Sequence, residues 1–296
     1  MNLKRILYLS ILSAFLTFSS CKKDSPTEPK INHPPVIERI IANPEEPFTD
    51  DEVRLECRAD DPDEGDTLDY DWRCDKGYFE NGIVNNRQVT WNSPTEVGNS
   101  YITVRVEDKE RASNSKGLEL KVISRFDTLF VVEDTFTEKY FPEWITQSDT
   151  IYYKHLIIYK DNNEWLAEPH LRYETPERSI KSAKIGFTIN NDREIDDNII
   201  LICDIHRINE SWSSNNLNWI NKPDFNVTPL HRFTIPAVQE YPSTFYIEGE
   251  NITNLVDSWR SSENYGFKIT TIQEGVIRNV YSKEGNYPPI IIVEYE

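Results

Sequence analysis

Residues 52–59 read EVRLECRA, and apolar side chains alternate with charged ones along the whole stretch. The same alternation returns in residues 68–75 (LDYDWRCD) and continues in residues 102–106 (ITVRV). Because successive side chains of a strand point to opposite faces, this pattern predicts strands with one buried and one wet face. The turn-rich segments between them indicate a small antiparallel β-sandwich over residues 33–124.

The rest of the chain, residues 125–296, also has the periodicity of strands. Residues 183–189 (AKIGFTI) alternate, and residues 199–208 (IILICDIHRI) begin apolar in both phases, which predicts a central strand covered on both faces. Further strands are expected at residues 265–271, 276–281 and 290–295. One short helix is predicted by the i, i+3, i+4, i+7 spacing of Ile252, Leu255, Val256 and Trp259. We therefore expect an all-β chain of two antiparallel sandwiches, the second jelly-roll-like with one short helix.

Composition supports this fold class and excludes several functions. The chain has 296 residues, 38% hydrophobic and 28% charged, which is enough for one large or two medium domains and excludes a disordered chain. Aromatic residues reach 12% against a single Met, which favours strands over helical bundles. With 32 basic and 50 acidic residues the net charge is −18, so we expect no nucleic-acid partner and no electrostatic attachment to a membrane.

The first 20 residues predict a signal peptide, because Lys4 and Arg5 precede an apolar run that is too short to span a membrane. Residues 18–21 (FSSC) resemble the bacterial lipobox, which implies lipidation of Cys21; an ordinary signal peptide with an incidental Cys is the alternative. Residues 22–32 (KKDSPTEPKIN) are expected to form a flexible tether. The resemblance implies an exported lipoprotein anchored in the outer membrane through its lipid alone, on the periplasmic side or at the cell surface.

Five short motifs stand out in the first sandwich: His33-Pro34-Pro35-Val36, Ala59-Asp60-Asp61-Pro62-Asp63, Tyr70-Asp71-Trp72, Trp91-Asn92-Ser93-Pro94 and Tyr101-Ile102-Thr103-Val104. With these motifs the domain resembles bacterial PKD and related immunoglobulin-like domains. Lys109-Glu110 departs from the pattern, since a Gly often follows the preceding Asp in that family. The resemblance implies a spacer or presenting domain without catalysis of its own.

Two side-chain sets in this domain suggest covalent or metal chemistry. Cys57 and Cys74 share the inward phase of their strands, which predicts a disulfide worth about 3 kcal/mol; two buried thiols are the alternative. Asp61, Asp63 and Asp66 are weak candidates for a Ca²⁺ site, the one cofactor left open. Because the turn lacks the complete calcium-loop pattern, a solvated turn is favoured over a metal site.

The second sandwich contains a series of motifs at residues 180–185 (IKSAKI), 205–212 (IHRINESW), 217–223 (LNWINKP), 252–256 (ITNLV) with Trp259, 264–267 (NYGF), 281–285 (YSKEG) and 288–290 (PPI). In the order and spacing of these motifs it resembles the DNRLRE domain, which is grouped with carbohydrate-binding modules as family 96. The resemblance is weaker before Ile180, where the name-giving motif is not preserved. It implies a domain that binds carbohydrate and often accompanies secreted polysaccharide-degrading enzymes.

An enzyme would need a catalytic constellation, and the sequence offers few. The five His residues lack the spacing of a zinc protease, and neither a nucleophile elbow nor a Gly-rich phosphate loop occurs. We therefore expect no catalysis, and a divergent polysaccharide hydrolase or lyase is the weaker alternative.

Sugar binding requires aromatic faces rimmed by hydrogen-bonding groups. Trp144 and Trp165 lie in polar sequence and are the candidate stacking residues, whereas Trp212, Trp219 and Trp259 are expected to be structural. His170, Arg172 and Arg207 are candidates to hold a uronate carboxylate. The alternatives are loop aromatics packed on the sandwich and solvated strand residues.

These observations combine into one expectation for function. Removal of residues 1–20 leaves 30 basic and 50 acidic residues, a net charge of −20, which favours a neutral glycan or an acidic one held by a local basic patch or a Ca²⁺ bridge. The expected protein is a surface lipoprotein that presents a polysaccharide-binding module on an immunoglobulin-like spacer. A structural or adhesive surface protein that binds a protein partner is the alternative.

Overall fold

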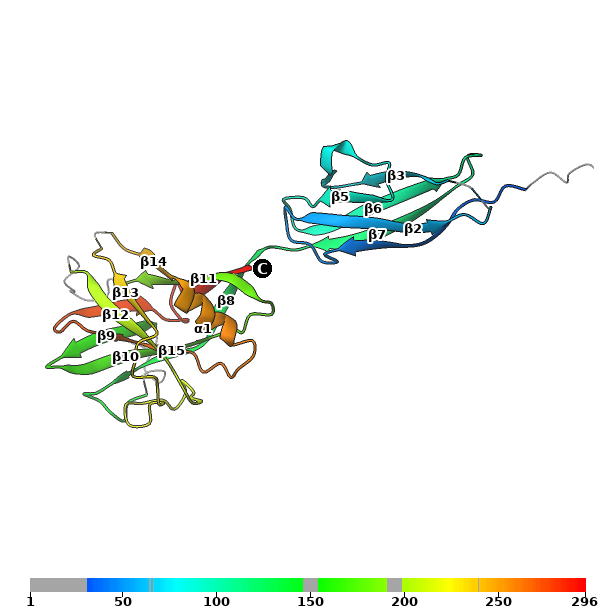
Figure 1. Cartoon of the computed structure of the whole chain (residues 1–296). Helices are drawn as coiled ribbons and strands as arrows, with labels where there is room; N and C mark the ends of the chain where they lie inside the picture. The colour runs from blue at the N-terminus through cyan, green and yellow to red at the C-terminus, as the bar shows by residue number, and fades with distance from the viewer. Residues whose placement is uncertain (1–30, 64, 66, 146–153, 191–198, 239) are drawn as a thin grey trace, which may run out of the picture. The chain divides into compact units, whose positions relative to one another are not determined.

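The computed structural model describes residues 31–296 except 64, 66, 146–153, 191–198 and 239, which Figure 1 draws in grey with residues 1–30. The predicted signal peptide, Cys21 and most of the predicted tether therefore lie outside the described residues. Within the described part of the chain, no helix has the length and apolar character needed to cross a membrane. The chain divides into two compact units. The first contains residues up to Glu45 with Val53–Asn92 and Ser100–Leu120, and the second contains Glu46–Glu52, Ser93–Asn99 and Lys121–Glu296.

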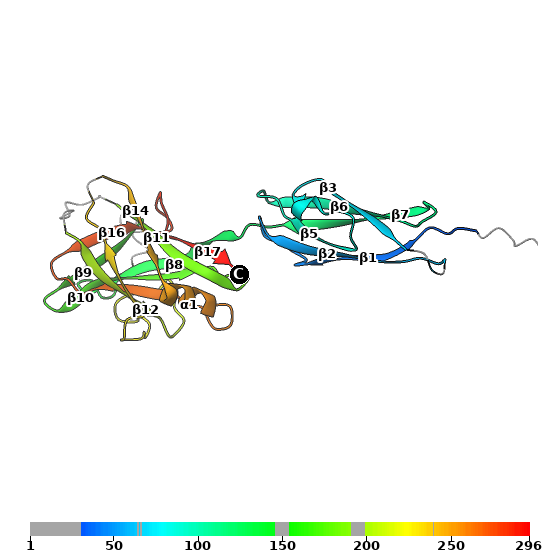
Figure 2. The ribbon, with the colours of Figure 1, turned by 45° about the horizontal axis from the view of Figure 1, so that its top comes forward.

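The first unit is an antiparallel β-sandwich, as the alternating sequence predicts (Figure 2). One sheet has the order β1 (Val36–Asn43), β2 (Glu52–Asp60), β5 (Gln88–Asn92) and β4 (Tyr78–Phe79). The other has the order β3 (Asp69–Cys74), β6 (Gly98–Glu107) and β7 (Ser113–Val122), and a 3-10 turn, Glu80–Gly82, follows β4. The inward residues of β2 and β6 are completely buried, including Leu55 and Val104, except for Ala59 near the end of β2, which is half-buried. The period of two therefore identified the core-facing side chains correctly.

The structure corrects the predicted disulfide, because Cys57 and Cys74 are both free thiols. Cys57 is completely buried in the sandwich, whereas Cys74 is only half-buried. Its sulfur contacts the Gly77 carbonyl oxygen at 3.7 Å instead. The two thiols share the inward phase of their strands but are not joined to each other.

The acidic turn after β2 uses its described carboxylates locally. Asp63 accepts hydrogen bonds from the His33 backbone at 2.7 Å, and Asp61 accepts one from the Asp63 backbone at 2.8 Å. Asp66 lies outside the described residues. In the described ranges, no group of three or more His, Cys, Asp or Glu side chains could hold a metal ion. The described residues of this turn therefore do not form a Ca²⁺ site.

The second unit is a two-layered antiparallel sandwich in which β8 (Phe126–Glu138) belongs to both layers. Residues 131–138 of β8 pair with β10, and residues 126–130 pair with β17. The first layer continues from β10 (Glu164–Tyr173) to β15 (Phe267–Thr271), β12 (Leu201–Arg207) and β13 (His231–Ile235). The second continues from β17 (Ile290–Tyr295) to β11 (Ile180–Ile189) and β14 (Ser243–Glu248), and β9 (His155–Asp161) and β16 (Ile277–Tyr281) link the layers.

The core of this unit lies between the two layers. Ile185 of β11 and Ile205 of β12 are completely buried in it, as the strand predictions require. The predicted helix is α1 (Glu250–Ser258), which packs on β11 and buries Leu255 and Val256. Trp259, at its end, stacks on Tyr173 with ring centroids 6.4 Å apart and is structural, as expected. The strand predicted at residues 199–208 is covered on both faces, by the core on one side and by an irregular segment on the other. That second layer of cover forms the site described next.

Candidate functional site

The outward face of the first layer is polar and yet buried. Strand pairing places Thr135 of β8, His170 of β10, Lys268 of β15 and His206 of β12 in one row, each at most 2% exposed. Polar outward residues of a sandwich normally face water, so a buried row of this kind requires a cover with its own hydrogen-bonding groups.

The cover is the irregular segment between β12 and β13, residues 208–230, which we call the covering segment. It comprises the irregular loops drawn mainly in yellow beside β12 and β15 (Figure 1). The Trp212 ring meets His170 edge-on at 5.9 Å, and the Phe225 ring meets His206 edge-on at 5.3 Å. His206 also shares hydrogen bonds with the Asn226 carbonyl at 2.9 Å and the Thr270 hydroxyl at 3.0 Å. Aromatic rings and backbone carbonyls of one loop thus replace water on this face.

A charged cluster ties the sheet to the covering segment. Glu168 of β10 lies 3.0 Å from the ammonium of Lys268 and 3.0 Å from that of Lys222 in the covering segment. Burial by itself would raise the pKa of Glu168. The two ammonium groups of Lys268 and Lys222 lower it by more than burial raises it, so the net pKa is below the usual value and the carboxylate remains charged. Burial lowers the pKa of Lys268 to about 8 and that of His170 to about 3, so the His170 ring is neutral at pH 7.

The two lysines of this cluster also contact aromatic rings. Lys222 Nζ lies 3.3 Å from the centroid of the Trp219 ring, and Lys268 Nζ lies 3.4 Å from that of Phe225. Lys268 Nζ is also 5.4 Å from the centroid of Trp165. Contacts of this kind stabilise a cation over a ring face. Glu168 is therefore connected, through one lysine each, to Trp165 and to Trp219.

Trp165 and Trp219 line one hollow of about 370 Å³, which we call the Trp165–Trp219 hollow. Its other lining residues are Lys139, Lys160, Asn163 and Glu164. Trp165 is anchored by a hydrogen bond from its indole nitrogen to the Thr271 carbonyl at 3.0 Å, and the Trp219 backbone donates to the Pro142 carbonyl at 3.1 Å. Both rings remain partly exposed. The hollow therefore combines fixed aromatic surface with amine, amide and carboxylate groups.

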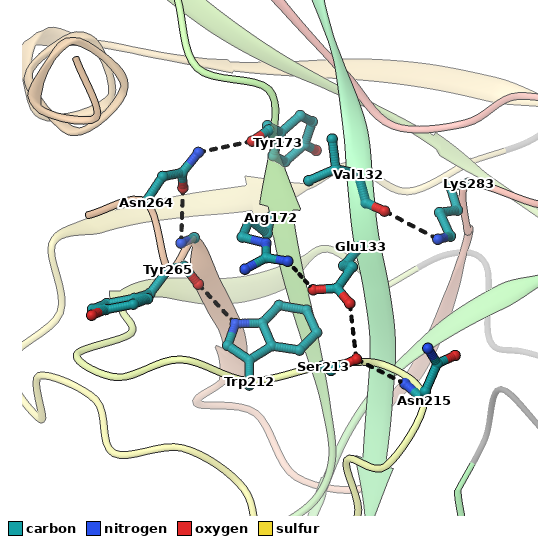
Figure 3. A network of polar contacts seen from close by, with 11 residues as sticks. Val132, Glu133, Arg172, Tyr173, Trp212, Ser213, Asn215, Asn264, Tyr265 and Lys283 are labelled. Atoms are coloured by element: carbon teal, nitrogen blue, oxygen red, sulfur yellow. Dashed lines mark hydrogen bonds and ion pairs between the residues drawn. The ribbon is translucent and has the colours of Figure 1, made fainter. Parts of the chain in front are cut away.

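A second polar network braces the other end of the covering segment (Figure 3). Arg172 of β10 is paired with Glu133 of β8, which also accepts a hydrogen bond from Ser213 at 3.0 Å. The Trp212 indole donates to the Tyr265 carbonyl at 2.8 Å. These groups satisfy one another, so this network holds the covering segment on the sheet. A hollow of about 390 Å³ lies beside it, lined by residues 211–213, Asn216, Leu217 and Asn221.

The structure brings four of the five predicted sugar-binding residues onto strands of this layer, and of these five Trp165 alone lines one of the two hollows described above. His170 is completely buried beneath Trp212 and does not reach the surface, which corrects its assignment as a ligand contact. Arg172 is occupied by Glu133, and Arg207 of β12 donates to the Ser258 hydroxyl. These three side chains are part of the scaffold rather than of either hollow.

Trp144 differs from Trp165. It packs edge-on against Phe136 and Phe141, with ring centroids 6.1 and 6.2 Å apart, in a small apolar cluster. Sequence reasoning missed Trp219, which it assigned to the structural set, and the two lysines of the hollow. For Lys139 and Lys160, the available signal was that they lie in the same polar region of the sequence as Trp165. Trp219 offered no such signal, because it is distant from Trp165 in sequence.

Among the comparisons with known proteins, the one with family models identifies a family. The model of carbohydrate-binding module family 96 matches residues 131–295, more than half of the chain. One similar solved structure, described as "Structural basis for the promiscuous specificity of the carbohydrate-binding modules from the beta-sandwich super family", is 12% identical. The match covers 89% of this chain and 97% of that one, with a TM-score of 0.27. Another, the SGBP-B protein of a Bacteroides ovatus mixed-linkage glucan utilization locus, is 7% identical, with coverages of 80% and 51% and a TM-score of 0.17. No curated protein matches the sequence.

Proposed function

The chain belongs to carbohydrate-binding module family 96, and on that premise we propose that it binds a glycan, without catalysis, in the Trp165–Trp219 hollow. The observation that carries the proposal is the meeting of two indole rings with amine, amide and carboxylate groups in one hollow. Apolar faces of sugar rings stack on aromatic rings, and hydroxyl groups need donors and acceptors at the rim. The volume of about 370 Å³ falls within the range of small-ligand sites.

Local charge narrows the ligand class. Lys139 pairs with Glu164, which leaves Lys160 as the cation of the hollow without a carboxylate partner among its lining residues. The strongly acidic chain repels a polyanion at long range, so a neutral glycan fits best, and an acidic one would need to place a carboxylate at Lys160. Affinity that falls with added salt would identify the acidic ligand, whereas a neutral ligand gives salt-independent affinity.

The experiment is affinity electrophoresis of residues 22–296 against neutral and acidic polysaccharides, with Ca²⁺ and with EDTA. Alanine at Trp165 or Trp219 should weaken binding by about 2 kcal/mol, roughly thirtyfold, which is the size expected for an aromatic anchor. Trp144→Ala is the matched control, because this tryptophan packs nearby but lies outside the hollow. Unchanged affinity in the Trp165 and Trp219 variants, or a loss confined to the Trp144 variant, would place the site elsewhere.

The proposal extends to how the module is presented. A lipid on Cys21, the tether of residues 22–32 and the first unit as a spacer would hold the glycan-binding unit away from an outer membrane, on its periplasmic side or at the cell surface. The support is the sequence of the first 32 residues. Cys21→Ser should abolish labelling by a radioactive fatty acid and release the chain from the membrane fraction, and retention of both would contradict the anchor.

A further inference from the structure

The outward face of the second layer carries a row of residues with an exposed aromatic side chain at each end. Strand pairing aligns Tyr246 of β14, Gly186 of β11, Ile290 of β17 and Phe130 of β8. Their chain neighbours, such as Ile185, belong to the core, so this row points away from it. Tyr246 and Phe130 are 50% and 54% exposed. Unlike the buried row on the first layer, this row is thus open to solvent at its two ends, while Ile290 is half-buried and Gly186 is buried.

Gly186 makes room for the tyrosine ring. A Cβ atom at Gly186 would approach Tyr246 Cε1 to 2.9 Å and Ile290 Cγ1 to 3.4 Å. The ring therefore occupies the space above the strand that a side chain at Gly186 would fill. Because one side of the ring rests on the strand and half of the side chain is exposed, an aromatic surface faces the solvent. Lys184 Nζ lies 4.9 Å from the ring centroid, so a donor stands next to this surface.

A hollow of about 750 Å³ lies on the same face, beside the next two rows of outward residues, which contain Lys184 with Glu248 and Ser182 with Glu294. Its lining includes Lys181, Ser182, Lys184, Glu248, Asn254 and Glu294, from β11, β14, β17 and the first turns of α1. Lys184 lines the hollow and also neighbours the tyrosine ring, so the hollow and the aromatic surface adjoin. The side chains offer ammonium, hydroxyl and amide donors as well as carboxylate acceptors.

We propose that this face is a second glycan-binding surface, on which Tyr246 stacks against one sugar ring and the adjoining hollow holds the following units of a neutral oligosaccharide. Sugar hydroxyls both donate and accept, which the mixed lysines and glutamates of the hollow satisfy. The inference goes beyond the proposed function, because the surface lies on the opposite layer from the Trp165–Trp219 hollow.

Charge and patterning select this occupant. The hollow contains two lysines and four glutamates, Glu248, Glu250, Glu294 and Glu296, so its net negative charge repels uronates, sulfates and phosphates. A protein interface of standard size buries about 800 Å² per partner around a core depleted of charge. On this face Lys184 and Glu248 stand in the row beside Tyr246, so a continuous apolar core is lacking. A flexible neutral chain, by contrast, can place hydroxyl groups against each charged side chain.

The test uses residues 22–296 with a neutral panel of mixed-linkage β-glucan, arabinoxylan and galactomannan, and with polygalacturonate as the acidic probe. The variants are Tyr246→Ala, Tyr246→Phe, Trp165→Ala/Trp219→Ala and the combination of all three alanine changes. Tyr101→Ala is the matched control, because Tyr101 is 52% exposed and also lies against a glycine, Gly117, but in the first unit. Slow alkylation of Cys203, which is completely buried in the second unit, verifies that each variant of that unit is folded, and slow alkylation of Cys57 does the same for Tyr101→Ala in the first unit.

We expect Tyr246→Ala to weaken binding to a neutral glycan about tenfold, with Tyr246→Phe and Tyr101→Ala close to wild type. The Trp165→Ala/Trp219→Ala variant should keep residual binding that the triple variant loses. Loss of all binding in the tryptophan variant together with an unaffected Tyr246→Ala variant would overturn the second surface and leave the proposed function intact. The reverse pattern would support the second surface and refute the Trp165–Trp219 hollow. Silence of the wild-type chain across the whole panel would overturn both.

Discussion

Replacing Glu168 with glutamine removes the negative charge that lies between two ammonium groups. The Glu168 and Lys268 side chains are both completely buried with their charged atoms 3.0 Å apart, and Lys222 contacts the same carboxylate at 3.0 Å. Removing one partner of a buried ion pair costs about 3–5 kcal/mol, because the other charge is left without compensation in a poorly solvated place. We therefore expect Glu168→Gln to lower the unfolding free energy of the second unit by about 3–5 kcal/mol.

The size of this loss should depend on pH. Burial lowers the pKa of Lys268 to about 8, and Glu168 opposes that decrease, so the pKa falls further once the carboxylate is gone. A lysine whose folded-state pKa lies below its unfolded value destabilises the fold while it is protonated, and that penalty is relieved as pH rises above the folded-state pKa. Since Lys268 of the variant loses its proton at a lower pH than wild type, the difference should be largest near pH 5 and smaller at pH 9.

The assay is pulsed alkylation of Cys203 across a urea gradient, read by mass spectrometry. Cys203 is completely buried in the core of the second unit and Cys57 in that of the first, so the two thiols report the units separately. Glu164→Gln is the matched control: it lies on the same strand and also pairs with a lysine, Lys139, but its side chain is 59% exposed. An exposed pair contributes about 0–1 kcal/mol, so this control should be nearly neutral.

Two results would refute the reasoning. One is a cost of Glu168→Gln below about 1 kcal/mol, indistinguishable from that of Glu164→Gln. The other concerns Glu168→Gln/Lys268→Met, which removes both charges and should recover part of the lost stability, because neutral replacements of a buried pair are tolerated. If the double variant is no more stable than Glu168→Gln, the penalty does not come from an uncompensated Lys268.

Three further predictions concern buried groups. Burial, and after it Glu284, raise the pKa of Asp134 to about 7. Its stabilising contribution is therefore complete below pH 4 and is lost as the pH rises through 7. Asp134→Asn should raise the Tm at pH 8 more than at pH 5, and an equal change at both pH values would contradict this. Burial lowers the pKa of His170 to about 3, so the folded state favours the neutral ring. The unfolding free energy should therefore decrease as the pH is lowered from about 6.5 to 3. His170→Gln should make the unfolding free energy from urea titrations depend less on pH over that interval, and an unchanged slope would count against this. Alkylation in denaturant without reductant should label both Cys57 and Cys74, whereas protection of the pair would reinstate the disulfide.

The sequence by itself determined the all-β fold, the faces of its strands and the family. Alternation along residues 52–59 identified Leu55 and Cys57 as buried, and the spacing of Leu255 and Val256 located helix α1. These inferences succeeded because side-chain direction in a strand or helix is a local property with a fixed period. Only Trp165 of the candidate site was within reach of the same reasoning, since its polar surroundings suggested exposure.

Only the tertiary structure decided which side chains meet. Alternation gave Cys57 and Cys74 the same inward phase, but whether two such thiols meet depends on how their distant strands are placed, and in the structure both are free. Likewise, Glu168 has the outward phase of a solvated strand residue, and it becomes buried because residues 208–230 fold back over the sheet. That return also brings Trp219 to Trp165. Periodicity fixes the face of a residue, whereas its height and its cover are set by contacts between segments far apart in the chain, which no local pattern encodes.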